Sequence, residues 1–130
     1  MNERELIKLY EAGKRDFSAA GLEGADLSGT DLSGTNLSGA FLTVADLREA
    51  KLAGAFLIGA NMVGANLSKA NLHKALLFGA NLSGANLSGA NLSEANLVWV
   101  NLEDARVTNE QLAQAQSLRF AIMPDGTRHD

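Results

Sequence analysis

The chain has 130 residues, a formal net charge of −4 and no cysteine. This length suits one domain, and so mild a charge gives no indication of direct nucleic-acid binding. The lack of cysteine excludes disulfides, thiolate metal sites and cysteine nucleophiles. Because the N-terminus is charged and no apolar run is long enough to span a bilayer, we expect a cytoplasmic protein that does not associate with membranes.

Residues 1–15 are predicted to form an N-terminal helical cap. The segment from Glu3 to Ala12 is rich in good helix formers, and Gly13 can end a helix. Its apolar residues supply one side that can pack on the rest of the protein: Leu6, Ile7, Leu9 and Tyr10. We expect this helix to act as a lid and not as an active element.

Residues 16–108 carry an apolar residue at every fifth position, from Phe17 to Val107, and nearly all of these are preceded two positions earlier by a small residue, usually Ala. On an α-helix this spacing turns each apolar residue about 140° from the last, so the residues share no buried side. In an extended piece the two inward residues share one face, and the chain must turn before the next piece. The two residues after each apolar one, typically Ser-Gly, suit the centre of a type II turn. The pattern therefore predicts a solenoid of short parallel strands around a Leu and Ala interior.

The number of sides per coil follows from which residues lie above one another. An offset of twenty residues, or four sides, brings opposite charges together in three pairs: Asp31 with Lys51, Glu49 with Lys69, and Lys74 with Glu94. One like-charge pair, Asp26 with Asp46, opposes this register, but an offset of fifteen would set Asp31 against Asp46. Four sides are therefore favoured. Asparagines that stack at this offset are expected to form a hydrogen-bonded ladder: Asn61, Asn81 and Asn101.

The run of A(D/N)LSG units from Ala25 to Ala105 resembles the pentapeptide-repeat family. The segments ELIKLYEAGKRDF and VTNEQLAQAQSLRF at its two ends are similar to those of small members that are common in cyanobacteria. The resemblance implies an all-β solenoid, a right-handed quadrilateral parallel β-helix with four pentapeptides per coil, roughly four to five coils and short α-helical caps at both ends. It implies little about activity, because few members have an assigned one.

Residues 109–130 are predicted to form a C-terminal helical cap and tail. Thr108 can cap a helix from Asn109 to Ser117, with Gln111 placed for a capping box. The apolar side of this helix would consist of Leu112, Ala115 and Leu118. Pro-Asp-Gly at 124–126 is a turn signal, and we expect the whole segment to close the second end of the solenoid.

One side of the coil departs from the polar outer pattern. Beside the core residues Leu57, Leu77 and Leu97, the outward positions are apolar, and we expect them to form one stripe: Phe56, Ile58, Leu76, Phe78, Val98 and Trp99. An exposed patch on the order of several hundred Å² generally marks an interface. Three interpretations remain open, because the stripe could pack under the protein's own tail, bind a second copy of the chain, or bind a different protein. The tail residues available to cover it are Phe120, Ile122 and Met123.

No enzymatic or ligand-binding motif accompanies the repeat. His73 and His129 lack partners at metal-ligand spacing, most serines occupy one corner position, and the regularly spaced glycines serve the corners. We therefore expect no catalytic, cofactor, metal or small-molecule site. The leading hypothesis is a non-catalytic structural scaffold for an unknown protein partner, with a homodimer among the options.

The alternative is a DNA-mimicking modulator of a DNA topoisomerase such as gyrase, which the family resemblance implies for some members. This mechanism needs a long acidic surface on a rod-shaped protein. The acidic residues here cluster only loosely and are interrupted by Arg48 and Lys51: Glu23, Asp26, Asp31, Asp46 and Glu49. The sequence therefore favours the scaffold.

Overall fold

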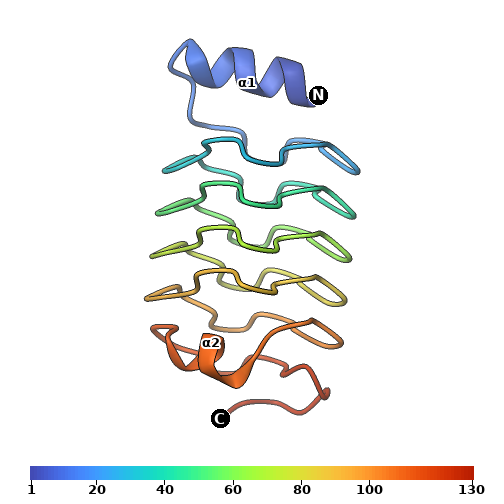
Figure 1. The fold of residues 1–130 in the computed structure, drawn as a ribbon, viewed down its shortest axis with the longest axis vertical. Helices are drawn as coiled ribbons and strands as arrows, with labels where there is room; N and C mark the ends of the chain where they lie inside the picture. The colour runs from blue at the N-terminus through green and yellow to red at the C-terminus, as the bar shows by residue number, and fades with distance from the viewer.

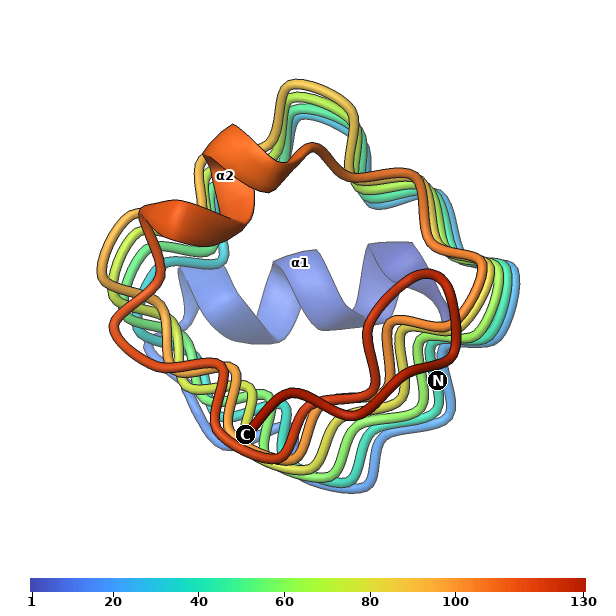
Figure 2. The same cartoon turned by 90° about the horizontal axis from the view of Figure 1, so that it is seen from below.

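The computed structural model describes residues 1–130 and contains two helices, α1 (Glu3–Glu11) and α2 (Asn109–Ala113). Between them the chain winds into coils that stack along the long axis of the molecule, with α1 at one end and α2 and the C-terminus at the other (Figure 1). Viewed along the stack, the coils superimpose around a common interior, and α1 lies across the far end of the stack (Figure 2). Neither helix has the length or the apolar composition needed to cross a membrane.

Successive coils pair through parallel bridges between residues twenty positions apart, from Asp16 with Asn36 to Asn86 with Arg106. The twenty-residue register predicted from the charges is therefore confirmed. The bridges are isolated and no continuous strand is present, because a corner in every five residues leaves room for only one paired residue on each side. Each bridge is held by two backbone hydrogen bonds, such as Leu57 N–H to Leu76 C=O at 2.7 Å and Leu76 N–H to Ala55 C=O at 2.9 Å.

The interior consists of the large apolar residue and the small residue of each repeat. Leu57 and Ala55, for example, are both fully buried, and the same holds throughout the middle of the stack. Alanine suits its position because four walls converge on a narrow interior that has no room for a second large side chain. Thr35 is the one buried polar residue, and its hydroxyl donates to the C=O of Leu32 at 2.7 Å.

The corners have the predicted turn geometry. The N–H of Ala25 donates to the C=O of Leu22 at 3.0 Å, and Gly24 between them has φ of +67°, as a type II turn requires at this position. Where the repeat lacks glycine, the conformation persists, so that Val44 has φ of +50° and Trp99 has φ of +61°. Pairing with the neighbouring coils therefore holds these residues at positive φ, a backbone conformation that non-glycine residues rarely adopt.

The predicted asparagine ladder is wrong at Asn61, Asn81 and Asn101. Each of these side chains instead accepts a hydrogen bond from the backbone N–H two residues later, as Asn81 Oδ1 does from Ser83 at 3.0 Å. The reason is that the first corner residue points its N–H away from the neighbouring coil, and a short polar side chain just before the turn can accept it. Only Asn91 and Asn71 are joined along the stack, at 3.4 Å.

The three predicted charge pairs occupy neighbouring coils, but none of them forms an ion pair within 4.0 Å. Exposed long side chains lose more conformational freedom in such contacts than weak Coulomb attraction in water returns. The ion pair that does form joins Arg48 to Asp46 at 2.7 Å, and Nε2 of His73 lies 3.6 Å from Oε2 of Glu94. Arg48 also offsets the repulsion between Asp46 and Asp26, which are bridged as the register requires.

The N-terminal helix matches its prediction to within one residue. The side chain of Asn2 caps α1 by accepting from the N–H of Glu5 at 2.9 Å, and Leu6 is fully buried against the first coil. The first coil has backbone N–H groups that no preceding coil can accept, such as that of Gly21, and α1 lies over this end of the stack (Figure 1). The helix therefore closes an edge to which another chain could otherwise add.

The C-terminal helix is shorter than predicted, because it ends at Ala113 and not at Ser117. The capping box of Thr108 and Gln111 is confirmed, and Gln111 also donates from Nε2 to the carbonyls of Leu87 at 2.7 Å and Ala90 at 3.0 Å. The chain then resumes the coil, since Ser117 bridges Asn96 and Ile122 bridges Asn101 at an offset of 21 residues. Backbone pairing with the preceding coil thus ends the helix four residues early.

Candidate interaction face

The apolar face is the outer surface of the side whose core residues are Leu37, Leu57, Leu77 and Leu97. Its outward apolar residues are those predicted from the sequence: Phe56, Ile58, Leu76, Phe78, Val98 and Trp99. Backbone pairing brings them together. Phe56 bridges Leu76. The N–H of Gly59 donates to the C=O of Phe78, and the N–H of Gly79 donates to the C=O of Val98. Phe56 and Leu76 form one column, and Ile58, Phe78 and Val98 form the next.

Four of the six side chains are well exposed. The exposed fractions are 41% for Phe56, 40% for Ile58, 45% for Phe78 and 48% for Trp99, whereas Leu76 and Val98 are half-buried. Large side chains exposed to this extent on adjacent coils amount to a continuous apolar surface.

The tail reaches only the C-terminal end of this face. The ring of Phe120 stacks on Trp99 with 4.7 Å between centroids, and the guanidinium of Arg128 lies 5.0 Å from the Trp99 centroid. The other two tail residues considered lie elsewhere, since Ile122 bridges Asn101 on the next side and Met123 packs against the core. Phe56, Ile58 and Phe78 remain exposed beyond the tail.

The apolar face also lacks charge. Along this side, no ionisable residue occupies an outward position between Asp16 on the first coil and Arg119 in the C-terminal segment. The other three sides carry charged residues within the same coils, such as Glu103, Arg48 and Lys74. A charge-free centre rich in aromatic residues is the composition that distinguishes the core of a protein interface from ordinary surface.

Sequence reasoning missed two exposed apolar residues on the adjacent side, Phe41 and Val44, whose exposed fractions are 49% and 63%. The signal was present, because Phe41 replaces the usual Asn or Asp just as Phe56 does. They have fewer apolar neighbours in register, since Phe41 bridges Gly21 on one side and Asn61 on the other.

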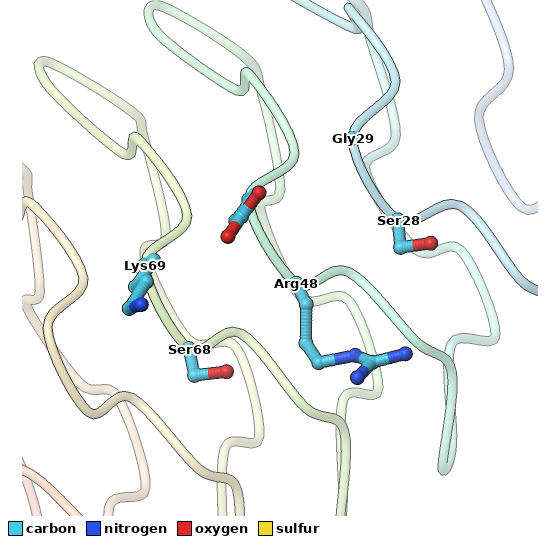
Figure 3. A pocket seen from close by; sticks show the side chains of 6 residues that line it. Ser28, Gly29, Arg48, Ser68 and Lys69 are labelled. Atoms are coloured by element: carbon cyan, nitrogen blue, oxygen red, sulfur yellow. The ribbon is translucent and has the colours of Figure 1, made fainter.

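A shallow polar groove of about 420 Å³ runs along one corner of three successive coils (Figure 3), lined by Ser28, Gly29, Arg48, Glu49, Ser68 and Lys69. One of its two cations is already engaged, because Arg48 donates to both carboxylate oxygens of Asp46, at 2.9 and 2.7 Å. These hydrogen bonds hold the pKa of the Asp46 carboxyl below its ordinary value. The labelled side chains of Arg48 and Lys69 leave different coils and do not converge on one point (Figure 3).

His73 lies between a serine and a carboxylate, but the arrangement is not that of a catalytic triad. Its Nδ1 is 2.7 Å from Ser93 Oγ, and its Nε2 is 3.6 Å from Glu94 Oε2. The Ser93 hydroxyl donates to Asn91 Oδ1 at 2.6 Å, so Nδ1 of His73 must donate to Ser93 and cannot take its proton. The structure contains no group of three or more side chains able to hold a metal ion.

The family model described as pentapeptide repeats (8 copies) matches this chain three times, over residues 16–48, 45–84 and 70–109. The chain belongs to the pentapeptide repeat family. A comparison with curated proteins found no match. Among solved structures, this pentapeptide repeat protein is similar to Rfr23 from the cyanobacterium Cyanothece 51142, with 42% identity and a TM-score of 0.70 over 72% of this chain and 64% of that one.

Two further solved structures are similar to this pentapeptide repeat protein. The pentapeptide repeat protein alr5209 from Nostoc PCC 7120 is 35% identical, with a TM-score of 0.58 over 88% of this chain and 93% of that one. QnrB1, a plasmid-mediated fluoroquinolone resistance protein, is 23% identical with a TM-score of 0.61, and the match covers 65% of this chain and 44% of that one. The chain therefore spans about two thirds of Rfr23 and less than half of QnrB1. These neighbours establish the pentapeptide repeat fold, a quadrilateral β-helix.

Proposed function

We propose that this pentapeptide repeat protein is a non-catalytic scaffold that binds a protein chain through its apolar face. The proposal is supported above all by one observation: Phe56, Ile58 and Phe78 are each at least 40% exposed on adjacent coils, where this side carries no charge. Covering them would remove apolar surface from water, which is worth about 25 cal/mol for each Å² buried.

The aromatic side chain at position 56 takes the place of a local hydrogen bond of the fold. Every Asn or Asp at the equivalent position, from Asp16 to Asn101, accepts a hydrogen bond from the backbone N–H two residues later. Phe56 cannot accept one, so the N–H of Ile58 has no protein partner. A residue that forgoes a local hydrogen bond and exposes an aromatic ring suits binding better than stability.

The fold also suits a binding surface that is formed before the partner arrives. Backbone hydrogen bonds tie each coil to its neighbours on every side, so the face loses little conformational entropy when it is covered. We further propose that the coil is right-handed, because connections between parallel strands of one sheet are right-handed in nearly all proteins.

The alternative function, modulation of a DNA topoisomerase by DNA mimicry, has weaker support. The acidic residues that could imitate phosphates fall on three different sides, with Glu23 on one, Asp26 and Asp46 on the next, and Asp31 on a third. One of them, Asp46, is already paired with Arg48. Inhibition of gyrase-catalysed supercoiling at low micromolar protein, abolished when the acidic residues are neutralised, would reverse this preference.

The scaffold proposal is tested by replacing the apolar residues with those of the preceding coil, where Asn36 and Ser38 stand. We expect the variant F56N/I58S/F78S to fold as well as the wild type and to lose a protein that the wild type retains from a lysate of the native organism. The matched control is Phe41→Asn, which removes an equally exposed aromatic residue from the adjacent side. Retention of the same proteins by the wild type and the triple variant, with no change in self-association, would refute the proposal.

A further inference from the structure

We propose that the chain covering the apolar face is a second copy of this protein, packed face to face with the two stacks running in opposite directions. This inference rests on the proposed function, since it names the partner of the same surface. It follows from how the residues are distributed over the levels of the face, where a level is the part of one coil that lies on this side.

The two ends of the apolar face carry different residues, whereas its two central levels are both apolar. The bridges define six levels, beginning at Asp16, Asn36, Phe56, Leu76, Asn96 and Ser117. A two-fold axis in the plane of the interface, perpendicular to the stack and midway between the Phe56 and Leu76 levels, sets each level against its mirror level in the partner. Such an axis is the commonest symmetry of homodimers, and it requires a surface to complement itself.

At the two central levels, apolar residues would meet apolar residues. The axis sets Phe56 against the partner's Leu76, and Ile58 against the partner's Phe78, within the same columns that backbone pairing creates. Each of these four side chains would therefore be covered by another of the four.

At the next levels outward, a protruding residue would meet a flat surface. Trp99 stands at a corner and is 48% exposed, and the axis sets it against the Ser38 and Gly39 corner of the partner. Gly39 has no side chain, so this corner leaves room for an indole ring. On the neighbouring column, Asn36 and Asn96 would face each other, and each keeps its amide N–H₂ free because only its Oδ1 is engaged locally.

At the outermost levels, opposite charges would meet. Asp16 and Arg119 form no ion pair within their own chain. The axis sets Arg119 opposite Ser18 of the partner, two residues from Asp16 and within reach of the long arginine side chain. Packing with both stacks in the same direction would instead bring the two Asp16 residues to one level and the two Arg119 residues to another, which argues for the opposite orientation.

The size of the face sets the expected strength. Six levels about 4.8 Å apart and a side of about three extended residues give an area on the order of 300 Å² per copy. Stable complexes bury about 800 Å² per partner, so the dimer should be weak and should form only at high protein concentration.

The test is the mass of the full-length protein by sedimentation velocity, from low micromolar to millimolar concentration. We expect the wild type and Phe41→Asn to move from monomer to dimer with the same dissociation constant, and F56N/I58S/F78S to bind at least tenfold more weakly. A wild type that stays monomeric at the highest concentration, or a dimer that the triple variant does not weaken, would overturn the inference. If the triple variant still loses a different protein from the lysate in that case, the proposed function stands and only the second copy is wrong.

Orientation is tested by exchanging the charges at the two ends. We expect Asp16→Arg and Arg119→Asp each to weaken self-association at low salt, because each creates two like-charge contacts in the antiparallel dimer. An equimolar mixture of the two variants should recover the wild-type affinity, since every contact at the ends is then between opposite charges. A mixture that binds more tightly than the wild type would indicate parallel packing and would refute the antiparallel arrangement. Thermal unfolding of each variant confirms that folding is unchanged.

Discussion

The side-chain Oδ1 of Asn81 accepts a hydrogen bond from the backbone N–H of Ser83 at 3.0 Å, across the start of a corner. This bond recurs wherever Asn or Asp precedes the core leucine, and it satisfies a backbone donor that points away from the neighbouring coils. The preference of the repeat for Asn or Asp at this position is therefore a matter of local backbone chemistry. At positions that lack this hydrogen bond, the side chain serves a purpose other than satisfying the local backbone donor.

We expect Phe56→Asn to stabilise the isolated protein. The new side chain would accept from the N–H of Ile58, as its equivalent Asn36 accepts from Ser38 at 3.0 Å. A hydrogen bond of this kind contributes about 0.5–1.5 kcal/mol, which urea denaturation at low protein concentration can measure. Phe56→Ser, which removes the ring but supplies a poorer acceptor, is the control. If both variants are less stable than the wild type, the ring contributes to the fold, and if Phe56→Asn is no more stable than Phe56→Ser, the new hydrogen bond adds nothing.

The corner at Val44 offers a second stabilising change. Its φ of +50° is costly for a β-branched residue, so Val44→Gly should raise the free energy of unfolding by about 1 kcal/mol. The reciprocal change is Gly84→Ala, at φ of +68° with nothing within 4 Å of the new methyl group. It should cost about 1 kcal/mol through backbone strain alone. Equal denaturation midpoints for both variants and the wild type would show that the corners tolerate any residue.

Acid should destabilise the protein through its corner aspartates. Hydrogen bonds from Ser28 lower the pKa of Asp26, and the hydrogen bond from the Ser33 N–H lowers that of Asp31. Because the folded-state pKa is the lower one, the stabilisation is complete above the unfolded value of about 3.9 and is lost as the pH falls towards the folded value.

The measurement for this pH dependence is the melting temperature from pH 7 to pH 2. We expect a plateau above about pH 5 and a decline below pH 4. The double variant D26N/D31N should decline less, because asparagine keeps the hydrogen-bond acceptor without titrating. Glu23→Gln, at a carboxylate that accepts no hydrogen bond, should follow the wild type. Identical curves for D26N/D31N and the wild type would exclude these two aspartates as the cause.

The lid function of α1 is tested by Leu6→Asp. Leu6 is the one fully buried residue of this helix, and a carboxylate there should detach α1 from the first coil. The freed edge should then join other chains end to end, giving species larger than a dimer whose size grows with concentration. The change is made in the F56N/I58S/F78S variant, so that association through the apolar face cannot contribute. A species that remains monomeric at millimolar concentration would refute the lid function.

The repeat itself made most of the fold predictable. A period of five conflicts with both a helix and a flat strand, so only a coil with corners fits it. The pairing of opposite charges then indicated twenty residues for each coil. The positions of Phe56, Ile58, Phe78 and their neighbours followed from that register, because core and outward positions alternate strictly. The composition of the apolar face could therefore be predicted from the amino-acid sequence.

The errors have a common physical origin, since all concern competition between local and long-range contacts. Asn81 could bond along the stack or to its own backbone, and the local bond won because it orders fewer groups. Glu49 and Lys69 lie in register, but water competes effectively for both charges. Residues 114–117 have a helical pattern, yet pairing of Ser117 with Asn96 supplies backbone hydrogen bonds that helix propensity cannot outweigh. The sequence pattern of one segment does not show how strongly distant residues compete for its hydrogen bonds.

The twenty-residue register constrains how the length of this protein can change. Insertion of one five-residue unit would leave every leucine inside, but it would rotate all later coils by a quarter turn. If such a unit were inserted between Leu57 and Leu77, Phe56 and Phe78 would lie on different sides of the coil, although the five-residue unit around each would be unaltered. Only the gain or loss of twenty residues together moves Phe78 and Trp99 up or down the stack without rotation. Duplication of whole coils is therefore the change in length that preserves a surface made from several of them.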